Sequence, residues 1–296
     1  MLIQTSALSE KQLEQLIRLA ATCKQLDSNL IPLHYPIIAQ PRYIGHNLLY
    51  YHQEQLVGFL SPFFFYDDAC EIALLIRPNF RRKNIAKTLI QQLIPLLHAE
   101  KINRVIFSVS DSSSSLQAYL LSKSFKSIQT EYQMSLQITG LIHHESSGLI
   151  IRQATLSDLE ELCKLDQNCF PDPLDRDMRR RFRTLLTDPN YIVLVASLRQ
   201  QLIGKSHMQL LANHVAQLTD IAITPRLQSN GYGSHMLIAT VNLAIKLQVK
   251  QLILDVDSMN LKALHLYKKS GFDIINTMNY WEIDLTMLAK HYSSMP

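Results

Sequence analysis

The chain has 296 residues, of which 47% are hydrophobic and 18% are charged, a composition typical of a soluble globular protein and not of a disordered one. The net charge of +4 favours an anionic ligand but is too small to indicate nucleic-acid binding. No apolar run approaches the ~18 residues of a membrane span, no signal peptide opens the chain, and the four cysteines form no C-x-x-C pair. These features predict a cytoplasmic protein with reduced thiols, no metal, and neither a membrane nor a nucleic-acid partner.

The expected elements are clearest in the second half of the chain. In chain order they are a strand at 149–153, a helix at 157–168, a second helix within 171–186, strands at 191–197, 202–210 and 217–223, a helix at 231–247, a strand at 251–257, a helix at 260–270, and closing strands at 272–275 and 280–285. Strands dominate at first and then alternate with helices. This order predicts an α/β fold, more closely an α+β mixed sheet with helices on its faces.

Certain residues recur at a nearly constant distance, which indicates an internal repeat. They are Gly58 with Gly204, 146 residues apart, and Pro78 with Pro225 and Phe125 with Phe272, each pair 147 residues apart. Each half also opens with a helix-start pattern, Ser9-x-x-Gln12 or Ser157-x-x-Glu160. The sequence therefore predicts two homologous domains, 1–138 and 149–296, joined by a short polar linker at 139–148.

Two glycines, Gly231 and Gly233, follow the strand expected at 217–223, in a chain that has only 8 glycines. Glycine lets the backbone bend and approach a ligand closely. The N-terminus of the following helix presents unpaired N–H groups and a partial positive charge, which together bind phosphate. An ordinary tight turn explains a lone glycine pair equally well, and neither G-x-x-x-x-G-K-[ST] nor G-x-G-x-x-G is present.

Two motifs of the second half resemble signatures of the GNAT superfamily of N-acetyltransferases. PRLQSNGYGSHML resembles the acetyl-CoA loop [QR]-x-x-G-x-[GA], and LDVDSMNLKALHLYKKSGF resembles N-x-x-A-x-x-L-Y-x-x-x-G-F. The matching residues of the second motif are Asn260, Ala263, Leu266, Tyr267, Gly271 and Phe272. The resemblance implies two tandem GNAT-like domains, each a mostly antiparallel twisted sheet flanked by helices, with a splayed pair of central strands.

The resemblance also implies a coenzyme site and a reaction, the direct transfer of an acetyl group from acetyl-CoA to an amine. The pyrophosphate would lie on the backbone amides of Gln228, Ser229, Asn230, Gly231, Tyr232, Gly233 and Ser234. The pantetheine arm would pair with Ile221, Ala222 and Ile223 on one side and contact Asn260 and Ala263 on the other. The Ile223 amide would polarise the thioester carbonyl, and Tyr267 would bind the coenzyme and protonate the departing thiolate.

A general base for the amine is less clear from the sequence. Asp220 is the only carboxylate on the strand before the loop and is ranked first, although strand alternation could turn it away from the cleft. The alternatives are a water relay or one of four other side chains: Asp255, Asp257, His207 and His214.

The first half carries degenerate versions of both motifs. Its loop offers Arg81, Arg82, Lys83, Asn84, Ile85 and Ala86, with Asn84 in place of the first glycine, and asparagine tolerates a left-handed turn. Ser113, Leu120 and Ser124 stand at the positions of Asn260, Tyr267 and Gly271. We expect a catalytically weak or inactive copy that braces the second domain; whether its loop cations still hold acetyl-CoA is left open.

The acceptor is expected near the segment between the first two helices, which holds Asp172, Asp175 and Asp177, followed by Arg179, Arg180, Arg181 and Arg183. These charges could select an amine substrate, but a solvated helix face is favoured. Three hypotheses remain: an acetyl-CoA-dependent acetyltransferase of a small amine; a transferase of a protein amine, lysine or N-terminus, for instance a bacterial effector in a host cytosol; and a coenzyme A-binding regulatory module without catalysis. Acyl-chain length stays open, and the chain is expected to be a monomer or homodimer.

Overall fold

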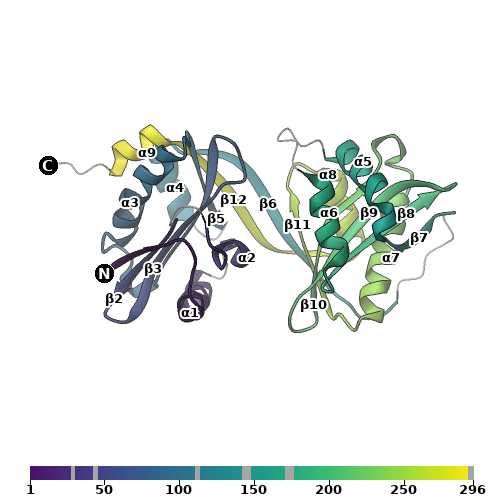
Figure 1. Cartoon of the computed structure of the whole chain (residues 1–296), viewed down its shortest axis with the longest axis horizontal. Helices are drawn as coiled ribbons and strands as arrows, with labels where there is room; N and C mark the ends of the chain where they lie inside the picture. Colours follow the sequence, from purple (N-terminus) through teal and green to yellow (C-terminus); the bar gives the residue numbers. More distant parts are fainter. Residues whose placement is uncertain (28–30, 43–45, 111–113, 142–147, 171–176, 293–296) are drawn as a thin grey trace. The chain divides into compact units, whose positions relative to one another are not determined.

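The structure, a computed structural model, describes residues 1–27, 31–42, 46–110, 114–141, 148–170 and 177–292 (Figure 1). The chain divides into two compact units, Met1–Thr130 with Asn276–Pro296, and Glu131–Ile275. Both units combine helices with a mixed sheet, so the predicted α/β fold class is confirmed. No helix among the described residues is long and apolar enough to cross a membrane.

The first unit has the strand order β1-β2-β3-β4-β5-β12, antiparallel except for the parallel pair β4–β5. Its elements from the first half of the sequence are β1 (Leu2–Thr5), α1 (Glu10–Asp27), α2 (Tyr35–Ile38), β2 (Asn47–His52), β3 (Gln55–Phe63), β4 (Ala69–Ile76), α3 (Ile85–Ala99), β5 (Arg104–Ser110) and α4 (Ser114–Ser122). The end of the chain adds β12 (Asp273–Asp284) and α9 (Leu285–Tyr292).

The second unit repeats this plan with the order β6-β11-β10-β9-β8-β7, in which only β10 and β11 are parallel. Its elements are β6 (Lys126–Gln137), β7 (Ile150–Gln153), α5 (Leu159–Cys169), α6 (Met178–Thr187), β8 (Tyr191–Leu198), β9 (Gln201–Leu210), β10 (Val215–Ile223), α7 (Tyr232–Lys246), β11 (Gln251–Asp257) and α8 (Leu261–Lys269).

The two long strands β6 and β12 are exchanged between the units (Figure 1). Residues 131–137 of β6 pair with β11 of the second unit, and residues 278–284 of β12 pair with β5 of the first. The compact units therefore differ from the sequence repeat at 1–138 and 149–296, because each half of the sequence supplies the other unit's last strand. The two closing strands expected at 272–275 and 280–285 are instead the single strand β12, and α9 was not anticipated.

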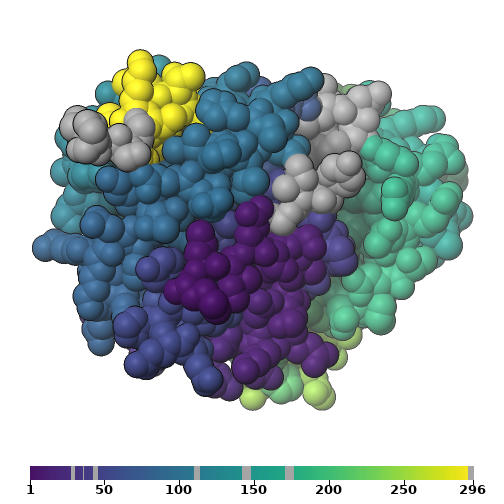
Figure 2. Space-filling view, turned by 60° about the vertical axis from the view of Figure 1, so that its left-hand side comes forward, coloured from purple at the N-terminus to yellow at the C-terminus, as the bar shows by residue number. Residues whose placement is uncertain are grey.

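Strand alternation builds a hydrophobic core on each face of each sheet. On β8, Leu194 faces a core shared with α7 and α8, whereas Val193 and Val195 face α5 and α6. The first unit has the equivalent two cores, and the only tryptophan of the chain, Trp281 of β12, is buried in one of them. Figure 2 shows α9, in yellow, on the surface among the blue and teal residues of the first half.

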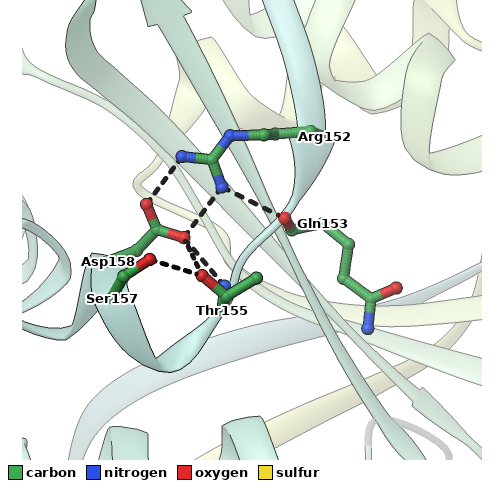
Figure 3. Close-up of polar contacts among 5 residues, drawn as sticks. All are labelled: Arg152, Gln153, Thr155, Ser157 and Asp158. Atoms are coloured by element: carbon green, nitrogen blue, oxygen red, sulfur yellow. Dashed lines mark hydrogen bonds and ion pairs between the residues drawn. The ribbon is translucent and has the colours of Figure 1, made fainter.

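The two halves begin their first long helices differently. Ser9 and Gln12 form the predicted reciprocal cap, with the Ser9 N–H donating to Gln12 Oε1 (2.9 Å) and the Gln12 N–H to Ser9 Oγ (3.3 Å). In the second half, the predicted pair Ser157 and Glu160 was wrong. The cap is Thr155 with Asp158, because a 3-10 turn begins one residue after Thr155. Arg152 holds the Asp158 carboxylate with both terminal nitrogens (2.8 and 2.6 Å; Figure 3).

Candidate active site

The central strands of the second unit separate where the two motifs meet. β10 and β11 are paired only from Val215–Gln251 to Leu218–Leu254, and beyond this point the strands diverge. A cavity of about 680 Å³ lies at the divergence, lined by the end of β10, the glycine loop and α8. The splayed strand pair implied by the family resemblance is therefore present in this unit.

The glycine loop has a fixed backbone conformation. Gly231 precedes α7 with φ +82°, and Ser229 also has a positive φ of +66°. The Gln228 side chain donates to the Ile223 carbonyl (3.1 Å), which ties the loop to the end of β10. A Cβ on Gly233 would meet only Leu266 Cδ2 at 3.5 Å, so protein packing does not require this glycine. Its missing side chain instead leaves the cavity open beside the N–H groups of the first turn of α7.

Helix α8 supplies the opposite wall of the cavity. Asn260 caps the helix, its Oδ1 accepting from the Ala263 N–H (3.2 Å), so its amide group is held at the cavity. Tyr267 lies one to two turns further along and is 8% exposed. Burial raises the pKa of Tyr267 to about 12, which keeps the hydroxyl protonated near neutral pH. A protonated phenol facing a cavity can donate a hydrogen bond or a proton to a ligand.

The end of β10 contains a β-bulge that decides where Asp220 points. The pairing with β9 shifts between Thr219 and Ala222, and Asp220 has a φ of +49°. Its carboxylate contacts His207 Nδ1 and an Arg181 nitrogen, each at 3.1 Å. Burial alone would raise the pKa of Asp220, but the hydrogen bond from His207 and the charges of Lys205 and Arg181 hold it well below its usual range. Such a carboxylate is a weak proton acceptor.

Beside the bulge, a buried lysine and a buried histidine belong to the same polar cluster. Lys205 is fully buried and forms an ion pair with Asp166, its ammonium lying over the rings of Phe170 and Phe182. Burial lowers the pKa of His207, which favours the neutral ring. Neither side chain lines the cavity, so both support the strand from behind.

Most of the residues predicted to bind the coenzyme in the second unit line this cavity. It is lined by Ile221, Ala222, Ile223, Gln228, Ser229, Gly231, Gly233, Ser234, Asn260, Ala263 and Tyr267. Asn230 does not line it, because its amide bonds the carbonyls of Leu227 and Gln228, and Tyr232 and Asp220 lie outside the lining as well. The cavity also contains residues that the sequence did not point to. Cys169 and Phe170 lie more than fifty residues before the end of β10 and belong to no motif. Leu261, Lys262 and His265 occupy variable positions of the second signature.

The first unit has a smaller cavity at the same place, about 460 Å³. β4 and β5 are paired only over Ala69–Ile72, and Asn84 precedes α3 with φ +60°, so the predicted left-handed turn at Asn84 is confirmed. Arg82, Asn84, Ile85 and Ala86 line the cavity, whereas the Lys83 ammonium lies over the Phe80 ring. Arg81 also lines it, but both terminal nitrogens of its guanidinium bind Asp27 (2.8 and 2.6 Å) and its Nε donates to Ile76 O (3.1 Å).

Some of the predicted residues cannot be placed. Ser113, Asp172, Asp175 and most of the linker lie outside the described residues. Within the described ranges no group of histidine, cysteine and carboxylate side chains is arranged to hold a metal ion.

Splayed central strands and a backbone loop at a helix N-terminus occur in both units, and in the second unit the Tyr267 of the signature lines the cavity as well. A model of the acetyltransferase (GNAT) family matches residues 13–120 and again 159–272. The chain belongs to this family. A search of curated proteins found no match.

Solved structures with the same tandem fold span nearly the whole chain. A GCN5-related N-acetyltransferase from Sphaerobacter thermophilus matches with a TM-score of 0.80 at 13% identity, covering 96% of both chains. A tandem GNAT protein from the clavulanic acid biosynthesis pathway matches with a TM-score of 0.76 at 12% identity, covering 96% of this chain and 98% of its own. A GNAT-family acetyltransferase from Colwellia psychrerythraea matches with a TM-score of 0.65 at 16% identity, covering 96% of this chain and 99% of its own. At these identities the likeness concerns the fold.

Proposed function

We propose that the protein is an acetyl-CoA-dependent N-acetyltransferase whose chemistry takes place in the second unit. The observation that carries this proposal is the single cavity where β10 and β11 diverge, because residues of both sequence signatures, far apart in the chain, line it together. The loop N–H groups suit a pyrophosphate, and the gap between the strands suits an extended arm.

The roles of the residues follow from their positions. The backbone of Ile221–Ile223 would hold the arm as an added strand, with the Ile223 N–H polarising the thioester carbonyl. Asn260 would bond the arm from α8. Tyr267, protonated because burial raises its pKa to about 12, would donate to the sulfur as the C–S bond breaks.

We propose that the first unit has a structural or regulatory role, because it does not keep the signature residues at the positions of Asn260 and Tyr267. Leu120, which is buried, replaces Tyr267, and Leu116 occupies the position of Ala263 at the cavity wall. Arg82 and Lys87 still border its cavity, so binding of acetyl-CoA there without transfer is the second candidate function.

The acceptor is proposed to be a primary amine, either a protein lysine or N-terminus or a small amine. Two of the four arginines expected to select it form ion pairs within the chain. Arg179 pairs with Glu160 and Arg181 with Asp220, which favours a structural role for these two charges.

Two measurements test the proposal together. Calorimetry measures the binding of acetyl-CoA, and an assay of free thiol measures acetyl transfer to each amine of a panel. We expect wild-type protein to bind acetyl-CoA and acetylate at least one amine. Tyr267→Phe should bind acetyl-CoA equally well but transfer ~10²–10⁴-fold more slowly. Leu120→Phe, at the corresponding position of the first unit, is the matched control and should leave the rate unchanged. Unchanged transfer by Tyr267→Phe would show that Tyr267 is not the acid.

A further inference from the structure

Asp255 of β11 lies at the point where the two central strands part. It follows Leu254, the last β11 residue paired with β10. Leu254 and Val256 pack into the same core as Tyr267, so alternation places Asp255 on the opposite face of the sheet. Asp255 is exposed on that face and does not itself line the cavity, so the acceptor amine of the proposed reaction would reach the gap from the side opposite to Tyr267.

Two amides hold the Asp255 carboxylate in place. Gln133 of β6 donates to Oδ1 and Gln217 of β10 donates to Oδ2, each at 3.2 Å. The Gln217 bond crosses between the strands at the last stretch where they are still paired. No cation forms an ion pair with Asp255 within the part of the chain that the structure describes. Asp255 is therefore an oriented carboxylate that is held by two neutral amides.

The charged residues that neighbour Asp255 along β11 and β6 are acidic, while the same face of the sheet also carries the cluster of Asp220, His207 and Arg181. Asp257 lies two residues further along β11 than Asp255. Glu131 on β6 is the residue paired with Asp257. On β10 the residues beside Asp255 are the neutral Gln217 and Thr219. Desolvation raises the pKa of Asp255, and the hydrogen bonds from Gln133 and Gln217 oppose this rise without cancelling it. Asp220 presents the opposite case, since His207 and Arg181 bind it and lower its pKa.

The first unit provides an internal comparison. At the 147-residue repeat distance, Asp255 corresponds to Ser108 on β5, which lines the smaller cavity. The first unit thus has neither a tyrosine at the position of Tyr267 nor a carboxylate at the position of Asp255, while it has the diverging strands and the left-handed loop.

We infer that Asp255 is the general base of the acetyl transfer, an inference that rests on the proposed function. The carboxylate accepts a proton from the ammonium form of the acceptor. The freed nitrogen lone pair forms the C–N bond to the acetyl carbon, the C–S bond breaks, and the thiolate takes the proton of Tyr267. The nitrogen loses its second proton to solvent as the amide forms, and solvent carries the proton of Asp255 back to Tyr267, so each turnover releases free coenzyme A and one proton.

Two amines distinguish a base from a structural carboxylate. Cadaverine is protonated at neutral pH and needs a base, whereas methoxyamine is already neutral. For Asp255→Asn we expect kcat/KM with cadaverine to fall ~10²–10⁴-fold at neutral pH. With methoxyamine, after subtraction of the uncatalysed rate, the fall should be less than tenfold. The rise of wild-type activity with pH that reports deprotonation of the base should disappear in the variant.

Controls separate this inference from the proposed function. Asp273→Asn removes an exposed carboxylate of the same unit and should change neither rate. Asp255→Ser, which copies Ser108 of the first unit, serves if Asp255→Asn fails to fold. Equal losses with both amines, or no loss with cadaverine, would overturn Asp255 as the base. No transfer by wild-type protein to either amine or to lysine amide, with acetyl-CoA bound, would instead count against the proposed function.

Discussion

β4 and β10 are the same strand of the repeat, yet only β10 is bulged. Both strands begin 146 residues apart, at Ala69 and Val215, and end 147 residues apart, at Ile76 and Ile223. β4 pairs with β3 without a shift, whereas the β10–β9 pairing shifts between Thr219 and Ala222. The extra residue of the second half is therefore absorbed by the bulge.

This bulge changes the chemistry available to the second unit. A β-bulge re-aims the residues after it, and in β10 it lets Asp220 face the His207 and Arg181 cluster while Ile223 still packs into the α7 core. The first unit has the buried Ala73 at this part of β4, and its described residues form no ion-pair cluster at that position. Diverging strands are thus common to both copies, whereas the bulge and its charged support belong to the second alone.

Separating the halves should have the largest effect. Fragments 1–138 and 149–296 each lack the strand that closes their own sheet, so neither should fold alone, and mixing should restore both. Trp281 is the only tryptophan and is buried in the first unit, so its emission should shift to the blue on mixing. A full chain cut within 139–148 is the control and should stay associated. Native emission from 149–296 alone would refute the strand exchange.

Deleting Asp220 should convert β10 into a strand like β4. We expect the fold to persist, because β4 forms without a bulge, but transfer to fall ~10²-fold or more since the residues that face the gap lose their alignment. Circular dichroism and thiol release measure the two effects. Asp220→Asn keeps the chain length and should lose less activity than the deletion, so a reversed order would argue against the bulge.

Replacing Gly231 should test the loop. Its φ of +82° is costly for most residues, and we expect Gly231→Ala to destabilise the unit by about 1 kcal/mol and weaken acetyl-CoA binding. Gly231→Asn should be milder, because Asn84 already occupies the left-handed region at the same position of the first unit. Thermal unfolding and calorimetry report both values, and equal effects of the two variants would contradict the comparison.

The smallest effect is expected at the helix caps under acid. Arg152 lowers the pKa of Asp158 to about 2, so its cap contributes stability above the ordinary aspartate pKa and loses it as pH falls from about 4 to 2. The Ser9–Gln12 cap does not titrate. Hydrogen exchange should therefore loosen at α5 before α1 over this range. Asp158→Asn should remove the difference at a cost of about 1 kcal/mol.

Much of the site followed from the sequence because its signals are local. The glycine loop, Asn260 and Tyr267 each belong to a short continuous motif, so the resemblance to the GNAT signatures was enough to locate them. Cys169 and Phe170 could not be found in this way, since they reach the cavity from a helix end far upstream. Asp220 was ranked first as the base because the sequence shows its place on the strand before the loop, but not that His207 and Arg181 bind its carboxylate.

The sequence by itself determined the repeat, the order of elements and the backbone demands of Gly231 and Asn84, because these are set by short-range sterics and hydrophobic spacing. Only the tertiary structure decided which strands close which sheet, since an edge accepts any strand that matches its register and buries its apolar face. It also decided which carboxylates meet cations: Asp220 lies against His207 and Arg181, and Asp255 against two neutral amides, because charge pairing depends on distance in space and not along the chain.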